Sequence, residues 1–188
     1  LSFSGSSSEV YATKLQAGPG LFTLALWFNT TTTTGGKLIG FGGSQTGAST
    51  NYDRHVYMTN SGQVVFGVYP GSIQTITSPA AYNNGAWHHA AAMLSGAGMA
   101  LYIDGQLVAS KATVTSAQSY NGYWRIGYDN LNAWISAPSS YAFKGTLDDV
   151  QVYNRALAAS EVAALATVAP AAPRIITQPA SQTVTAGQ

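Results

Sequence analysis

The sequence predicts an all-β fold in which two antiparallel sheets pack face to face as a sandwich. The first observation is the stretch 83–110, which has the pattern of three antiparallel strands joined by two turns. Its second turn contains Asp104-Gly105, a pair that tolerates the positive φ angles of a tight hairpin. The second observation is that the strands at 86–94 and 99–103 carry apolar or small residues on both faces. This pattern is typical of central strands in a two-layer sandwich.

Alternation of apolar and polar residues predicts the remaining strands. An opening strand pair is expected within 1–12, and single strands at 21–30, 37–43, 54–59, 63–69, 73–77 and 123–128. One face of the hairpin made by 54–59 and 63–69 is apolar, so the opposite face carries His55, Tyr57, Val65, Gly67 and Tyr69. By the same argument Tyr123 and Arg125 lie opposite Trp124 and Ile126. Loops are expected at 30–36, 45–52 and 129–141.

The best helix candidate is 159–166, where one face carries Val162, Leu165 and Ala166. Its start lacks half of a capping box, because Ala158 has no side-chain oxygen for the backbone N–H three residues later. We expect this to cost about 1 kcal/mol. Glu161 should partly offset the loss through the helix dipole.

The composition of the 188 residues limits the classes of partner. Charged residues make up 8% of the chain and the net charge is +1, against about 25% charged residues in an average globular protein. Since no block of Lys or Arg occurs, we expect no nucleic-acid partner and no acidic membrane partner. No apolar run predicts a membrane-spanning helix. The absence of cysteine excludes disulfides and thiol chemistry.

Three segments follow one another in a recognisable order. They are 1–5 with 22–28, the Gly-Ala-Trp-His-His strand at 85–89 with the hairpin at 101–108, and the segment 145–157. Together they resemble the laminin-G-like domains of the concanavalin A-like lectin/glucanase superfamily, over roughly 1–166. The resemblance implies a jelly-roll sandwich at 1–168. Residues 169–188 are expected to be a proline-containing linker and the truncated first strand of a flanking immunoglobulin-like repeat.

A carbohydrate site is expected on the outward face of the sheet. The candidate ligand-binding residues are His55, Tyr57, Tyr69, Tyr123 and Arg125 on the strands, with Asp53, Asp129, Asn130 and Trp134 in bordering loops. Aromatic rings offer an apolar surface for the C–H face of a sugar, and the polar groups offer directional hydrogen bonds to hydroxyls. The alternative is that the tyrosines only cover a half-exposed sheet, where tyrosine is favoured in any case.

The resemblance also implies a structural calcium ion. In that family an aspartate of the closing strand and backbone carbonyls of early turns hold the ion. Asp148 matches the aspartate, and carbonyls near Gly5 and Gly42 could complete the oxygen set. The alternative is that the carboxylate of Asp148 bonds only backbone or solvent.

Catalysis is not expected. The glucanases of the superfamily use a Glu-x-Asp-x-Glu strand, and the sequence contains none. Asp148 and Asp149 are adjacent, so on a regular strand they face opposite sides and cannot act as an acid and base pair. The same argument separates His88 from His89, for which we expect structural roles.

The sequence therefore favours a non-catalytic carbohydrate-binding module of a secreted or surface protein, bacterial, monomeric and multidomain. The low net charge favours a neutral or mildly acidic polysaccharide, and Arg54, His55 and Arg125 leave room for a uronic acid or a sulfate. The alternative is a protein–protein adhesion or spacer module without a sugar ligand, because laminin-G-like domains serve both purposes. The chain begins at Leu1 without a leader, from which we expect a segment of a longer polypeptide.

Overall fold

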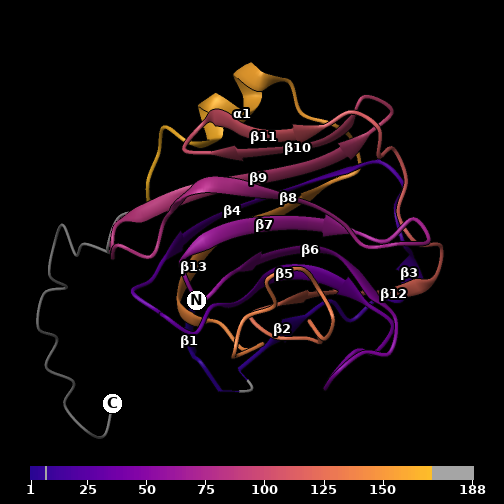
Figure 1. Cartoon of the computed structure of the whole chain (residues 1–188), viewed down its shortest axis with the longest axis horizontal. Helices are drawn as coiled ribbons and strands as arrows, with labels where there is room; N and C mark the ends of the chain where they lie inside the picture. Colours follow the sequence, from indigo (N-terminus) through magenta and orange to yellow (C-terminus); the bar gives the residue numbers. More distant parts are fainter. Residues whose placement is uncertain (7, 171–188) are drawn as a thin grey trace, which may run out of the picture.

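The computed structural model describes residues 1–6 and 8–170, and within them two antiparallel sheets form the predicted sandwich (Figure 1). The six-stranded sheet has the order β1-β13-β4-β9-β10-β11. Its strands are β1 (Ser2–Ser4), β4 (Phe22–Asn29), β9 (Trp87–Ser95), β10 (Gly98–Ile103), β11 (Gln106–Lys111) and β13 (Lys144–Tyr153). The part of the predicted linker and tail strand within 171–188 lies outside the described residues.

Seven strands make the second sheet within the described residues, in the order β2-β12-β5-β6-β7-β8 with β3 paired to β12. The strands are β2 (Val10–Tyr11), β3 (Gln16–Ala17), β5 (Gly36–Gly42), β6 (Tyr52–Met58), β7 (Gln63–Val68), β8 (Gln74–Ala81) and β12 (Asn121–Ile126). The predicted opening pair is wrong in its pairing, because β1 joins β13 in one sheet and β2 joins β12 in the other.

The three antiparallel strands predicted within 83–110 lie where the sequence predicts them. β9 is central, paired with β4 on one side and β10 on the other. β10 and β11 meet at Asp104 and Gly105, whose φ angles are 50° and 78°. Both angles are positive, as the first and second corner residues of a tight hairpin turn require, so the Asp-Gly pair suits this turn.

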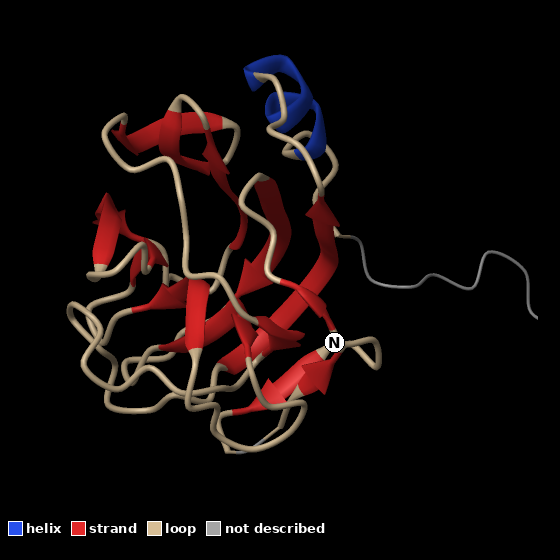
Figure 2. Cartoon of the chain, turned by 90° about the vertical axis from the view of Figure 1, so that its right-hand side faces the viewer, coloured by secondary structure: helices blue, strands red, loops and turns tan. Residues whose placement is uncertain are grey.

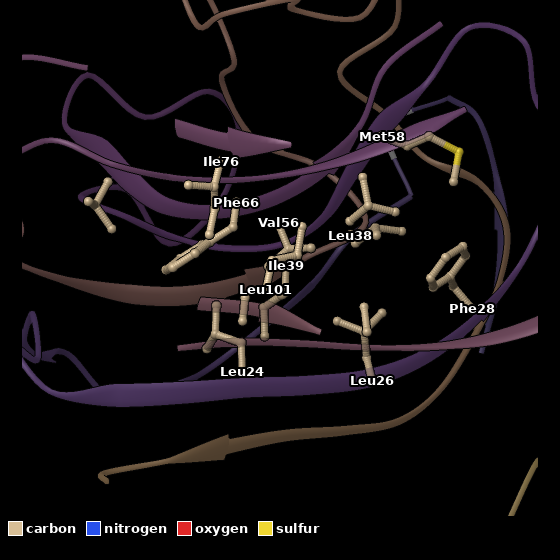
Figure 3. Packing of buried hydrophobic residues seen from close by; sticks show 14 of the residues in the cluster. Leu24, Leu26, Phe28, Leu38, Ile39, Val56, Met58, Phe66, Ile76 and Leu101 are labelled. Carbon is tan, nitrogen blue, oxygen red and sulfur yellow. The ribbon is translucent and has the colours of Figure 1, made fainter. Parts of the chain in front are cut away.

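The main core fills the space between the two sheets. Inward residues of β4, Leu24, Leu26 and Phe28, are fully buried there. Figure 3 shows Leu24 and Leu26 pointing toward Phe66 and Val56 of the opposite sheet. Burying each such side chain contributes about 1.5–3 kcal/mol relative to leaving it in water. Since Val56 and Phe66 face inward, their neighbours in sequence, Tyr57 and Val65, face outward.

The outer faces of the two sheets are covered by different elements. α1 (Ala159–Leu165) packs Val162 and the preceding Leu157 against Ala25, Ala91 and Met93 of the six-stranded sheet. In Figure 2 this helix lies at the top of the molecule, away from the loops gathered at the bottom. The outer face of the seven-stranded sheet is instead covered by residues 129–141, which we call the covering loop. Its Leu131 and Trp134 form a small apolar cluster with two outward residues of the sheet, Tyr57 and Val65.

The half-formed cap of α1 is confirmed. The N-cap residue Ala158 has the extended conformation of a cap, with φ −69° and ψ 153°, but makes no side-chain cap bond. Its backbone N–H donates to Glu161 Oε2 at 2.8 Å, and Glu161 also accepts two bonds from Arg155.

Ala158→Thr is therefore expected to stabilise the protein, because the hydroxyl would add a side-chain acceptor for the backbone N–H groups of the first helical turn and complete the capping box. The expected gain is about 1 kcal/mol, or about 2–4 °C in the melting temperature of a chain of this size. Scanning calorimetry would measure it against Ala158→Val, which has the same shape without the hydroxyl. An equal effect of both substitutions would contradict the explanation.

Candidate functional site

Among the described residues, six acidic or basic side chains of the seven-stranded sheet and the covering loop are buried. This buried charged cluster consists of Lys37 on β5, Asp53, Arg54 and His55 on β6, Arg125 on β12, and Asp129 at the start of the covering loop; each is 0–1% exposed. Charges are stable in such a place only when they are paired or hydrogen-bonded.

Asp129 lies at the centre of this cluster. Its Oδ2 is 3.4 Å from Lys37 Nζ and its Oδ1 is 4.0 Å from Arg125 Nη1. Ser49 donates its backbone N–H to Oδ1 at 2.8 Å and its hydroxyl to Oδ2 at 3.1 Å. A side chain on Gly42 would collide with both Asp129 Oδ2 and Ser49 Oγ, so this strand position requires glycine. Asp129 thereby ties two loops to the sheet.

Burial of the Lys37 ammonium group costs desolvation energy, and the ion pair with Asp129 partly offsets this cost. Complete burial lowers the pKa of Lys37 from 10.5 to about 8, while Asp129 opposes this shift. At neutral pH the ammonium group therefore keeps its charge. The pair is internal to the fold and is not available to a ligand.

The two arginines are also occupied by the protein itself. Arg125 forms an ion pair with Glu9 and donates to the backbone oxygens of Ser44 at 2.6 Å and Gly47 at 2.9 Å. Arg54 forms an ion pair with Asp53 and donates to the oxygens of Pro19 and Gln118. Burial raises the pKa of Asp53, and Arg54 opposes this shift. Both guanidinium groups fix loops in place.

The structure gathers the predicted ligand-binding residues but covers them. The predicted residues that it buries are Asp53, His55, Tyr57, Arg125, Asp129 and Trp134, whereas Tyr69, Tyr123 and Asn130 are half-buried. The predicted carbohydrate site on the outward face is therefore not open to solvent at these six residues. Strand alternation correctly assigned the face, but it gives no information on a loop that closes over it.

Gly67 and Trp134 explain how the covering loop is seated. A side chain on Gly67 would collide with the indole ring, so the space beside this glycine holds Trp134 rather than a ligand. The indole packs edge-on against His55, with 4.5 Å between ring centroids. Tyr57 donates its hydroxyl to the backbone oxygen of Ile135.

A pocket of about 400 Å³ remains beside the covering loop. Its lining residues are Thr50, Asn51, Tyr52, Tyr69, Ile73, Gln118, Asn132, Ala133 and Trp134. Of the residues predicted from the sequence, only Tyr69 and Trp134 line it. The others were missed, although the loop prediction for 45–52 and 129–141 pointed to the segments that supply most of them.

Some polar groups of the pocket lining are hydrogen-bonded within the protein, and others are not. Tyr52 donates its hydroxyl to Asn132 O at 3.1 Å, which joins the two loops that flank the pocket. The side-chain amides of Asn51, Gln118 and Asn132 make no hydrogen bond to any other described residue. The pocket therefore offers donors and acceptors that the fold does not use.

The predicted calcium ligands do not converge. Asp148 is exposed on β13 of one sheet, opposite Trp27. Gly42 belongs to the other sheet and lies beside Asp129, while Gly5 lies beside Lys144. Stacked sheets are about 10 Å apart, whereas calcium ligands lie at about 2.4 Å from the ion. These three positions therefore do not come together in the described residues, which also contain no group of three or more acidic or histidine side chains suited to a metal, and the calcium site stays a prediction.

The histidine pair has structural surroundings. His88 Nδ1 is 2.8 Å from Asp104 Oδ2, and the other oxygen of Asp104 accepts the backbone N–H of His89. The ring of His88 packs on Phe28 and that of His89 on Trp27, from opposite faces of the strand as predicted.

The regular alternation assumed for Asp148 and Asp149 was wrong. A bulge in β13 between Asp148 and Gln151 interrupts the register, and Asp149 has a φ of 45°. Both carboxylates are exposed. Alternation along the strand therefore does not exclude them as a pair, and the fold itself does not show catalysis.

Asp129→Ala is expected to destabilise the protein strongly, because it leaves Lys37 buried without its counter-charge. Removing one member of a buried ion pair costs about 3–5 kcal/mol, and each kcal/mol lowers the melting temperature by about 2–4 °C at this size. Asp148→Ala is the matched control, because its carboxylate is exposed. Similar melting temperatures for the two variants would refute the central role of Asp129.

Acid is expected to destabilise the fold through two histidines. Burial lowers the pKa of His55 well below 6.5, and Lys37 and Arg54 add to this; burial lowers that of His89 to about 4 against the pull of Asp104 and Asp149. The unfolded chain therefore binds these protons first as the pH falls. The contribution of the two histidines to the free energy of unfolding is fully present above pH 6.5 and is lost as the pH falls toward 4. Each unit of difference between the unfolded and folded pKa corresponds to about 1.4 kcal/mol.

Melting temperatures of the wild type and of the double variant His55→Phe/His89→Phe test this dependence. The variant should lose less stability over the same pH interval, whatever its stability at neutral pH. Parallel curves for the two proteins would assign the acid sensitivity to other groups.

Comparisons with solved structures support the fold. The heptameric SAP-like pentraxin from Limulus polyphemus has a TM-score of 0.65 at 19% identity, covering 88% of this chain and 80% of that one. The Ruminococcus gnavus IT-sialidase CBM40 bound to α2,3-sialyllactose has a TM-score of 0.62 at 21% identity, with 79% and 83% covered. Mouse laminin α1 domains LG4–5 have a TM-score of 0.58 at 23% identity, and the match covers 82% of this chain and 42% of that one.

The family comparison is consistent with these structures. No curated protein matches the chain significantly. The family model described as the concanavalin A-like lectin/glucanases superfamily, of the laminin G type, matches residues 4–163. The chain therefore belongs to the concanavalin A-like lectin/glucanase superfamily.

Proposed function

We propose that this chain is a non-catalytic carbohydrate-binding module and that the pocket between the covering loop and loop 43–51 holds the sugar. The observation that carries the proposal is the lining of this pocket. It combines two half-buried tyrosine rings with side-chain amides that the fold leaves free. A few well-placed polar groups beside an apolar wall are typical of small-molecule sites.

Each part of the lining suits a sugar. Tyr52 and Tyr69 offer ring surface to the C–H face of a pyranose, and Ile73 extends the apolar wall. Side-chain amides donate and accept at once, as sugar hydroxyls do. Because the pocket is open and few groups are fully buried in it, binding should be weak for a single site.

The structural neighbours support the class of ligand. The CBM40 domain was solved with sialyllactose bound, and its fold matches this chain. Laminin-G-like and carbohydrate-binding domains are typically extracellular, and none of the described helices is long and apolar enough to span a membrane. We infer a secreted or surface location, as a monomeric module of a bacterial multidomain protein with a flanking immunoglobulin-like repeat.

Tyr69→Ala is expected to abolish retardation of the protein in polysaccharide-containing native gels. Its hydroxyl makes no hydrogen bond to another described residue, and its ring lines the pocket, so the melting temperature should change by less than a few degrees. Tyr11→Ala is the matched control, since Tyr11 is an exposed tyrosine of the same sheet at its far edge.

Retardation lost in both variants, or in neither, would contradict the assignment of the pocket. Absence of binding by the wild type to a broad glycan array would favour an adhesion or spacer module instead. Release of reducing sugar from a retained polysaccharide would show an enzyme.

A further inference from the structure

The charged groups nearest to the pocket are all used by the fold. Within the described residues, the buried cations of this region are Lys37, Arg54 and Arg125, and their carboxylate partners are Asp129, Asp53 and Glu9. Three cations thus face three carboxylates, and burial keeps the remaining titratable member of the cluster, His55, neutral near pH 7. The cluster beneath the pocket has no excess charge to offer a ligand.

The charged groups of Asp53 and Arg54 are both hydrogen-bonded to the protein backbone behind the pocket. Arg54 donates to Gln118 O at 2.8 Å, and Asp53 Oδ2 accepts the backbone N–H of Gln118 at 3.0 Å and that of Tyr69 at 3.3 Å. The two charges hold the backbone behind the pocket. Of these four residues, only Gln118 and Tyr69 line the pocket, and both have uncharged side chains.

The lining itself contains no ionisable acid or base apart from its two tyrosine hydroxyls. Its polar side chains are those of Thr50, Asn51, Gln118 and Asn132. Hydroxyls and amides each donate and accept, which matches a neutral sugar hydroxyl. A sugar carboxylate or sulfate only accepts, and it is desolvated on entering, so its recognition calls for a cation or a fork of donors. The lining formed by the described residues supplies no cation.

We propose that the pocket selects neutral glycans and discriminates against those carrying sialic acid, uronic acid or sulfate at the bound residue. The inference rests on the carbohydrate-binding function proposed above and narrows its ligand class. It replaces the expectation that Arg54, His55 and Arg125 leave room for an acidic sugar, because all three are buried. It also separates this chain from its structural neighbour CBM40, which was solved with the acidic ligand sialyllactose.

Matched glycan pairs test the proposal with the wild-type chain. Isothermal titration with lactose and α2,3-sialyllactose, and native gels with xylan and glucuronoxylan or with agarose and carrageenan, compare each neutral glycan with an acidic relative. Wherever binding occurs, the neutral member should bind several-fold more tightly than its acidic relative. The Kd should change by less than about twofold between about 50 and about 500 mM NaCl, because no ion pair is screened.

The possible failures are distinguishable. Acidic members binding as tightly as their neutral matches or more tightly, or a Kd that weakens more than about twofold with salt, would overturn the neutral selectivity and leave carbohydrate binding intact. Absence of binding to every glycan would overturn both proposals together.

A substitution that adds a positive charge to the pocket lining provides the positive control. Asn51 is exposed at the rim and its side chain makes no hydrogen bond to another described residue, so Asn51→Arg should fold normally. It should raise the affinity for the acidic member of a bound pair several-fold and make that affinity sensitive to salt, whereas Asn51→Met should not. If Asn51→Arg leaves the preference unchanged, the sugar binds elsewhere and the inference is wrong.

Discussion

The buried carboxylate of Asp129 is the interaction on which the site depends. It pairs with Lys37 of the sheet, accepts two hydrogen bonds from Ser49 and one from the N–H of Asn130. An unpaired charge at this depth would cost several kcal/mol, so these partners must stay in place together. Since loop 43–51 and the covering loop supply most of the pocket walls, the shape of the pocket follows from the neutralisation of one charge below it.

Strand alternation predicted which side of the sheet each residue occupies, but not what lies above it. Val56 and Phe66 face the core and Tyr57 faces outward, as the two-residue period requires. Trp134 belongs to a segment without any period, so its position over Gly67 could not be predicted from local sequence. The bulge at Asp149 likewise depends on the pairing of β13 with β4, which no local pattern encodes.

The candidate site was predicted in part for the same reason. Tyr69 follows a regular strand and was identified by alternation. Tyr52 stands at the start of β6 and Gln118 in a segment without regular structure, so only the fold brings them together. The family resemblance carried the order of the strands correctly, but the calcium ligands that it implied need three chain segments to converge. Gly42 and Asp148 are in different sheets.

The division of labour between Tyr52 and its neighbours has an evolutionary consequence. The tyrosine hydroxyl joins the loops, and the charges below fix their backbones, whereas the amides of Asn51, Gln118 and Asn132 take no part in this framework. Substitutions at these three positions change what the pocket recognises while the supporting interactions remain intact. Recognition and stability are thus encoded by separate residues, so one scaffold can acquire new specificities by few mutations without first becoming more stable.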